Sequence, residues 1–218
     1  MNLTPTTTPK LIKNLFPNLV WELPNKEKVI YLTFDDGPTP EITAWTLNTL
    51  KEYKAKATFF CIGENVESHP EIFSKIVSEG HAIGNHTYNH VKGWKTNTKN
   101  YIDNIKKAHS VFQTSLPEGE KSASYNQLFR PPYGQIKPKQ IKKLSNLDYK
   151  IIMWSVLSVD WDNSISKEKC VENVIKNTTS GSIVVFHDSI KASANMQYAL
   201  PKVLDYFNKK GYSFEAIN

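Results

Sequence analysis

The chain has 218 residues, of which 39% are apolar and 22% charged, a composition typical of one soluble domain large enough to bury a sizeable core. Nine glycines and twelve prolines are too few for a collagenous or low-complexity chain, and no stretch approaches the ~18 consecutive apolar residues of a membrane span. The formal net charge is +6, but the lysines are scattered, so the charge favours solubility over binding to nucleic acid. We therefore expect a monomer that neither binds nucleic acid nor inserts into a membrane.

The two cysteines, Cys61 and Cys170, are too few for a disulfide framework, and both lie in apolar patterns that predict buried free thiols. The N-terminal residues, MNLTPTTTPKLIKNLFPN, lack a basic segment followed by an apolar core, so no secretory signal is predicted. The cytoplasm is then the default compartment. An extracellular or periplasmic location stays open if the chain has been trimmed.

Seven short runs of β-forming residues alternate with longer helical patterns along the chain. Repeated βα units predict a mostly parallel sheet with helices outside, either closed as a barrel or open and doubly wound. In a barrel, functional residues are expected just after the strands, at the carboxyl ends. The expected strands are residues 28–34, 57–61, 81–85, 127–130, 149–154, 182–186 and 212–217, and the longest expected loop is 113–126.

Helices are predicted where apolar residues recur at steps of three or four, around residues 72–77, 101–112 and 196–207. Proline suits the first turn of a helix and glycine suits the position after the last turn. On this basis we place helix starts at Pro40, Pro70 and Pro138 and helix ends at Gly80 and Gly211.

Two polar motifs follow the first and third expected strands. TFDDGP places Asp35 and Asp36 side by side at a sharp turn, and NHTYNH places His86 and His90 four residues apart, so that they face the same way if a helical turn forms there. Taken alone, each motif is also typical of an ordinary polar turn. Together, one aspartate and two histidines leave positions open for water and substrate, as hydrolytic zinc requires. The same ligand set serves non-haem iron oxygenases, which stay open as an alternative.

Three further motifs follow the fourth, fifth and sixth expected strands and therefore belong to the same predicted rim. They are FRPPYG with Arg130 and Tyr133, WSVLSVDW with Asp160 and Trp161, and VVFHDS with His187 and Asp188. Asp188 is read only as a hydrogen-bond acceptor that fixes a loop.

From residue 28 to residue 214, these five motifs in this order resemble carbohydrate esterase family 4, the polysaccharide deacetylases with a NodB homology domain. The resemblance implies an α/β fold, a distorted (β/α) barrel of seven or eight strands. It also implies a metal-dependent hydrolase that removes N-acetyl groups from an N-acetylglucosamine-containing glycan through a metal-activated water. We expect residues 1–27 to form an N-terminal extension that packs on the barrel and residues 28–218 to form the catalytic domain.

The resemblance assigns the roles residue by residue. Asp35 is the implied catalytic base, oriented by Arg130, and Asp36, His86 and His90 are the implied ligands of Zn2+, a site that Co2+ or Ni2+ also fits. His187 is the implied acid, assisted by Asp160. The amide of Tyr133 belongs to the implied oxyanion hole, and Tyr133 and Trp161 line the implied substrate site.

The substrate is less specified than the reaction. The resemblance admits peptidoglycan, chitin or chitooligosaccharide, with O-acetylated xylan or a catalytically inactive carbohydrate-binding protein as alternatives. The chain departs from the family at Leu157, where many members have aspartate, and at Val185, where leucine is usual. Neither departure affects a residue assigned to chemistry. Tyr88 and Trp94 lie close enough in sequence to the histidine pair to stack on a sugar.

Overall fold

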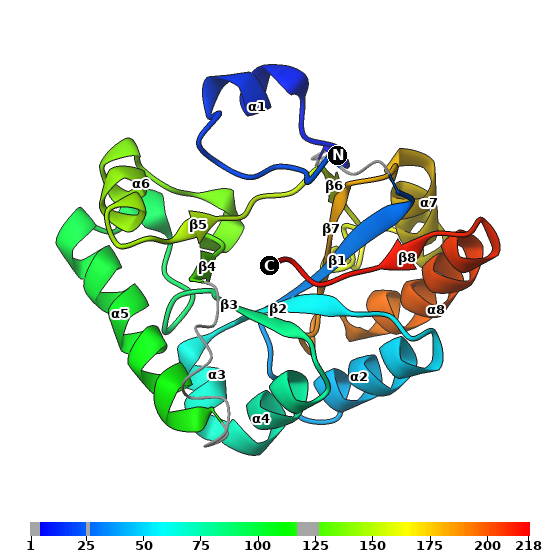
Figure 1. Cartoon of the computed structure of the whole chain (residues 1–218), viewed down its shortest axis with the longest axis horizontal. Helices are drawn as coiled ribbons and strands as arrows, with labels where there is room; N and C mark the ends of the chain where they lie inside the picture. The colour runs from blue at the N-terminus through cyan, green and yellow to red at the C-terminus, as the bar shows by residue number, and fades with distance from the viewer. Residues whose placement is uncertain (1–4, 25–26, 117–126) are drawn as a thin grey trace.

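The computed structural model describes residues 5–24, 27–116 and 127–218. Its centre is a parallel sheet in the order β5-β4-β3-β2-β1-β7-β6, with β8 paired to β1, and the sheet curls into a half-barrel (Figure 1). The predicted distorted barrel is confirmed. The strands are β1 Val29–Asp35, β2 Ala57–Cys61, β3 Ala82–Asn85, β4 Leu128–Phe129, β5 Lys150–Ile151, β6 Val156–Leu157, β7 Ile183–His187 and β8 Ser213–Phe214.

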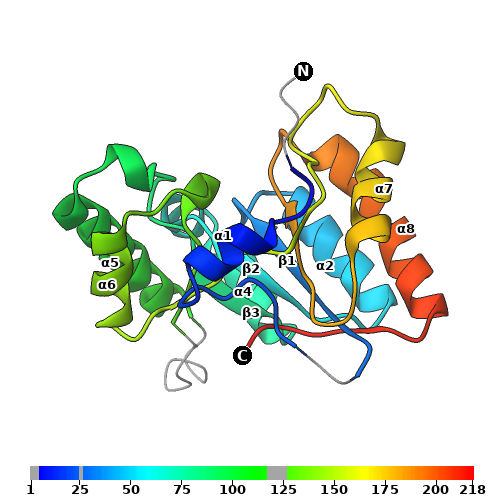
Figure 2. The same cartoon turned by 90° about the horizontal axis from the view of Figure 1, so that it is seen from above.

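Helices form an outer arc around the sheet, and Figure 2 shows α5 and α6 on one side of the molecule with α2, α7 and α8 on the other. Every residue of β1 and β2 is buried, as expected for parallel strands covered on both faces. No described helix is both long enough and apolar enough to cross a membrane. The helices are α1 Lys10–Leu15, α2 Ile42–Glu52, α3 Gly63–Ser68, α4 Pro70–Ser78, α5 Thr98–Ser115, α6 Pro138–Ser145, α7 Lys167–Asn177 and α8 Ser193–Lys209, with 3-10 turns η1 Gly93–Lys95 and η3 Pro132–Gly134.

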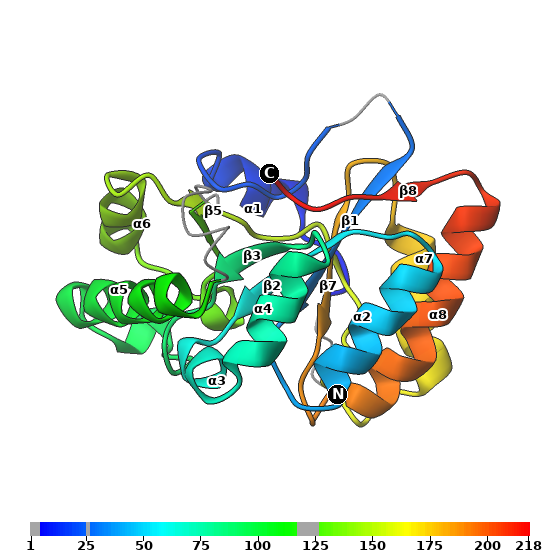
Figure 3. The same cartoon turned by 60° about the horizontal axis from the view of Figure 1, so that its bottom comes forward.

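Most of the predicted helix boundaries are confirmed. Figure 3 shows α4 and α6, which begin at Pro70 and Pro138. Gly80 and Gly211 both adopt the left-handed conformation expected of a residue after a helix. The helix start predicted at Pro40 is wrong by two residues, because α2 begins at Ile42. The next residue, Glu41, has a φ of 65°, which is outside the helical region and delays the start of α2.

Two other boundaries differ from the prediction. The expected loop 113–126 begins too early, because α5 continues to Ser115; residues 117–126 lie outside the described part of the chain. The strand expected at residues 149–154 is shorter than predicted: only β5 forms there, and the next strand of the sheet in the chain, β6, is separate from it. The carbonyls of Ile152 and Met153 accept hydrogen bonds from Arg130, so this stretch turns toward a buried side chain instead of continuing the ladder.

The N-terminal segment lies between the two ends of the sheet. Val20 forms a bridge with Ile152 beyond β5, and Thr7 forms a bridge with Val156 of β6. Trp21 is buried and its indole N–H donates to the carbonyl of Phe16 at 3.0 Å. In Figure 1 this dark blue segment crosses the open side of the half-barrel. Backbone pairing with the segment therefore satisfies edge groups that the open sheet would leave exposed.

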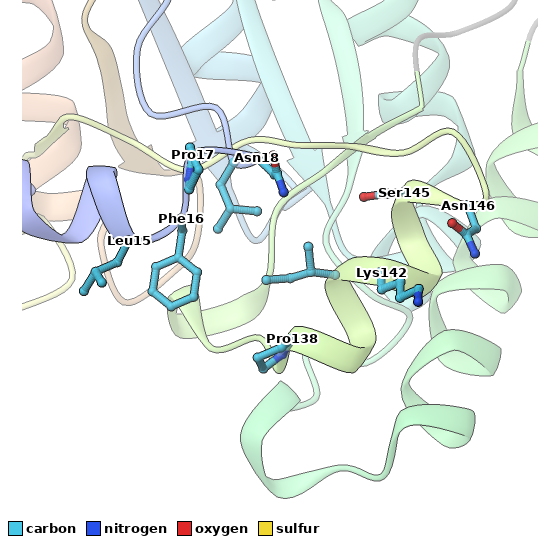
Figure 4. A pocket seen from close by; sticks show the side chains of 10 residues that line it. Leu15, Phe16, Pro17, Asn18, Pro138, Lys142, Ser145 and Asn146 are labelled. Atoms are coloured by element: carbon cyan, nitrogen blue, oxygen red, sulfur yellow. The ribbon is translucent and has the colours of Figure 1, made fainter.

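A cavity of about 500 Å³ separates this segment from α6 (Figure 4). Leu15 and Phe16 line it from the N-terminal side, and Lys142 and Ser145 line it from α6. None of the residues predicted to carry chemistry faces this cavity.

Replacement of Trp21 tests how much the N-terminal segment contributes to stability. We expect Trp21→Ala to lower the free energy of unfolding by about 3–5 kcal/mol, because it deletes a buried ring and leaves a cavity. Leu11→Ala is the matched control, since the Leu11 side chain is 70% exposed and its loss is expected to change stability by less than about 0.5 kcal/mol. Denaturant unfolding measures both, and equal stability of the two variants would contradict the prediction.

Candidate metal centre and active site

The register of the parallel strands brings the predicted motifs to one edge of the sheet. Asp35 at the end of β1 pairs with His187 of β7, and Asn85 at the end of β3 pairs with Phe129 of β4. The carboxyl ends are therefore level with one another. The next residues along the chain, Asp36 and His86, line one cavity, and Arg130 lies buried behind it in contact with Asp35, so the motifs meet at the predicted edge of the sheet.

Asp36, His86 and His90 come together as one potential ligand set. One ligand atom from each residue lies within 4.8 Å of the others. The Asp36 Oδ1 atom is 3.3 Å from Nε2 of His90 and 3.8 Å from Nε2 of His86. This oxygen is buried and has no hydrogen-bond partner among the described residues, which is costly unless a cation occupies the space between the three side chains.

The protonation states of the two histidines suit a divalent metal. His86 Nδ1 lies 2.8 Å from the carbonyl oxygen of Arg130, so Nδ1–H donates there and Nε2 is left with its lone pair. Burial lowers the pKa of His86 to about 4, against the opposing pull of the Asp35 carboxylate. Burial also lowers the pKa of His90. Neutral imidazoles are the form that binds metal, so the donor set fits Zn2+ or a similar ion.

The loop that carries the histidines does not form the helical turn that would by itself bring His86 and His90 to one face. Thr87 and His90 both have positive φ values, 68° and 57°, and the segment after β3 forms a bend. Asp36 is also strained, with a φ of 83°. Non-glycine residues in this region cost free energy of order 1–3 kcal/mol each and are concentrated at functional sites. The side chains converge because the backbone is held in an unfavourable conformation, which spacing alone does not reveal.

Asp35 and Arg130 form a fully buried ion pair beside the ligand set. Arg130 Nη1 donates to Asp35 Oδ1 at 2.6 Å and to the Thr33 hydroxyl at 2.7 Å. Burial by itself would raise the pKa of Asp35, but the Arg130 guanidinium, with the nearby His187 imidazolium, outweighs burial and lowers it below the usual value. Asp35 is therefore an ionised carboxylate at neutral pH.

His187, at the end of the strand next to Asp35, forms a second ion pair with Asp160. Asp160 accepts the backbone N–H of His187 at 2.7 Å, and its other oxygen lies 2.8 Å from His187 Nδ1. Burial opposes charge on the imidazole, but the Asp160 carboxylate overcomes this and raises the pKa of His187 to about 9. The imidazolium is thus the form present at neutral pH.

A cavity of about 530 Å³ connects these groups. One wall is apolar and includes Leu157, Val185 and Trp161, with the Trp161 ring 4.8 Å from the His187 ring. Both departures from the family pattern therefore lie in this apolar wall. The wall can hold a methyl group next to the ionised residues.

Tyr133 lies at the mouth of the same cavity, in the turn after β4. Its backbone has a φ of 59° and a ψ of 11°. The Gly134 N–H bonds to Pro131 and the Gln135 N–H to Pro132, both at 3.0 Å, so the turn holds the Tyr133 backbone in this conformation. A fixed amide is what an oxyanion-binding position needs.

Asp188 positions the Asp35–Asp36 turn, as its sequence reading suggested. It is fully buried and accepts hydrogen bonds from the Gly37 N–H at 3.0 Å and the Thr43 hydroxyl at 2.6 Å. A Cβ at Gly37 would stand 2.1 Å from Asp188 Oδ2, so only glycine fits there. Burial raises the pKa of Asp188 to about 7.

Sequence reasoning missed two polar residues that line the cavity, Ser189 and Lys191. Both follow β7, and their position after a strand end is the signal that could have identified them. The sequence analysis also did not anticipate a role for Thr33, whose hydroxyl accepts a hydrogen bond from Arg130.

Comparison with known proteins identifies close relatives. A family model described as polysaccharide deacetylase matches residues 22–152. A peptidoglycan-N-acetylglucosamine deacetylase of Bacillus cereus is 37% identical over 212 residues, which cover 95% of this chain and 96% of the relative. The peptidoglycan-N-acetylmuramic acid deacetylase PdaC of Bacillus subtilis is 31% identical over 193 residues, which cover 88% of this chain and 38% of PdaC.

Solved structures agree with these matches. The crystal structure of the Bc1960 peptidoglycan N-acetylglucosamine deacetylase has a TM-score of 0.86 and 32% sequence identity to this chain, and the match covers 96% of this chain and 95% of that one. The matched fold and the match to the family model over more than half of the chain lead to one conclusion: the chain belongs to the polysaccharide deacetylase family.

Proposed function

We propose that this protein is a metal-dependent hydrolase that removes the acetyl group from N-acetylated sugars of peptidoglycan. One observation carries the proposal: an ionised carboxylate, a protonated imidazole and an Asp-His-His ligand set open into the same cavity. An amide resists hydrolysis because water is a poor nucleophile and the amine is a poor leaving group until it is protonated. The site holds a group suited to each difficulty.

Asp36, His86 and His90 would hold the metal, for which we propose Zn2+. When bound, such an ion lowers the pKa of water and polarises the acetyl carbonyl. Asp35 takes up the proton of the attacking water, because Arg130 keeps it ionised and fixes the carboxylate through Oδ1. The two neighbouring aspartates thus have different tasks because their surroundings differ.

The remaining groups act as the C–N bond breaks. Tyr133 lines the cavity, and we assign its amide N–H to stabilise the negative charge that develops on the acetyl oxygen. His187 gives its proton to the departing nitrogen, so that the amine leaves as a neutral group. Leu157, Val185 and Trp161 enclose the methyl group of the acetyl.

The relatives support peptidoglycan over chitin or xylan as the substrate, since the Bacillus cereus protein that matches nearly the whole chain acts on peptidoglycan N-acetylglucosamine. The complete acid, base and ligand set favours an enzyme over an inactive carbohydrate-binding protein. Such a substrate favours a location outside the cytoplasm, in contrast to the default taken from the N-terminal residues.

Replacement of the base tests the central assignment. We expect Asp35→Asn to reduce acetate release from N-acetylated peptidoglycan by about 10²- to 10⁴-fold, because the amide cannot accept the proton of water. Loss of the buried pair with Arg130 also costs about 3–5 kcal/mol of stability, so rates are normalised to folded protein.

Asp162→Asn is the matched control for this variant. Asp162 follows β6 and accepts hydrogen bonds from the backbone and hydroxyl of Ser164, which an asparagine oxygen can also accept. We expect its activity to stay within about twofold of the parent. Unchanged acetate release by Asp35→Asn would show that another group is the base.

The Asp160 carboxylate sets the pH range of the reaction. Because it raises the pKa of His187 to about 9, the imidazolium is lost only as the pH rises through that value. In Asp160→Asn, burial is no longer opposed by this charge, so the basic limb of the pH–rate profile is expected to move to lower pH. A pH profile of kcat/KM measures the shift, and a basic limb at the parental position would remove His187 from the role of acid.

Removal of the metal tests the ligand set. We expect chelation to abolish acetate release and one equivalent of Zn2+ per chain to restore it. His90→Ala is expected to weaken Zn2+ binding at least 100-fold when measured by calorimetry, because it removes one of three protein ligands. His81→Ala is the control, since His81 lies at the opposite end of β3 and accepts a hydrogen bond from the Ala57 N–H. Equal Zn2+ affinity in both variants would contradict the proposed site.

A further inference from the structure

Two large aromatic side chains near the candidate site are exposed, Tyr133 and Trp94. Trp94 lies in η1, four residues after the proposed ligand His90, and is 61% exposed. Four residues of extended chain span at most about 13–14 Å, so Trp94 stays close to the ligand set. A single exposed aromatic residue is common by itself, so the contacts that hold Trp94 and its loop decide whether the ring is available to a ligand.

The loop that carries Trp94 is held rigidly against the neighbouring loop. The buried amide of Gln140 donates to the carbonyls of Gly93 at 3.0 Å and Thr96 at 3.3 Å. A Cβ at Gly93 would stand 2.1 Å from the carbonyl oxygen of Gln135, so the two loops touch backbone to backbone. The Trp94 ring is itself oriented, because its N–H donates to the carbonyl of Ile136 at 3.2 Å.

The faces of the Trp94 ring are free, in contrast to the other aromatic residues beside the site. The Lys107 ammonium lies 3.5 Å from the centre of the Tyr88 ring. The Tyr133 ring has the Lys92 ammonium 4.6 Å from its centre and the His90 ring 4.7 Å away. Among the described residues, no ring or ammonium packs on Trp94.

We propose that Trp94 stacks on a sugar residue that neighbours the residue being deacetylated. The inference rests on the proposed function, since it assigns a second binding position to the same polymer. An oriented indole with a free face suits the C–H face of a pyranose, and preorganisation reduces the entropy lost on binding. The site then recognises a chain of sugars rather than a single one.

Chain-length dependence tests this position. On a five-sugar fragment of the peptidoglycan glycan chain (the pentamer), Trp94→Ala is expected to lower kcat/KM about tenfold. On the two-sugar fragment (the dimer) kcat/KM is expected to stay within about threefold, so that the preference for the longer substrate is lost. Trp94→Phe keeps a ring and is expected to retain most of that preference. Phe16→Ala is the matched control, because Phe16 is also a partly exposed aromatic residue but lines the separate cavity beside α6.

Calorimetric binding of the same oligomers separates this inference from the proposed activity. Tighter binding of the pentamer than of the dimer, lost in Trp94→Ala but kept in Phe16→Ala, supports the stacking position even if no acetate is released. Equal loss of kcat/KM on both oligomers, or pentamer binding unchanged by Trp94→Ala, would overturn it. Failure of the parent protein to bind either oligomer would overturn it as well.

Discussion

The buried guanidinium of Arg130 connects more of the active site than any other group described. Its nitrogens donate to Asp35, to Thr33 and to the carbonyls of Ile152 and Met153, and its plane lies over the Phe60 ring at 4.1 Å. Its own carbonyl orients His86. A buried cation is tolerated only when its donors are satisfied, so the strands around it must stand in one arrangement. The same contacts explain why the sheet opens after β5, where carbonyls turn inward.

Two adjacent carboxylates acquire different chemistry from their surroundings. Asp35 faces an arginine and is kept ionised, whereas Asp36 presents a buried oxygen to two imidazoles. The left-handed backbone at Asp36 separates the directions of the two side chains, and Asp188 holds the following residue, Gly37, by accepting its N–H. The proposed division between base and ligand therefore depends on backbone conformation as much as on residue type.

The proposed mechanism divides the work among the groups that the cavity brings together. In it, Asp35 and the ligand set act on water, while the His187–Asp160 pair acts on the nitrogen. The apolar wall of the same cavity would receive the acetyl methyl group. The proposed stacking position, Trp94, lies on a neighbouring loop braced by Gln140. The proposals thus place reaction and chain recognition on loops that contact each other.

The sequence alone determined the βα order, the strand-end position of each motif and the residue types required for hydrolysis, because hydrophobic periodicity and local motifs are encoded within short stretches of chain. It could not determine the break between β5 and β6, the bend that replaces a helical turn between His86 and His90, or which aromatic ring stays uncovered. Those features arise from contacts between distant segments, such as Val20 with Ile152 and Arg130 with Asp35. Tertiary packing decided them, since only the assembled sheet can hold strained backbone and a buried ion pair in place.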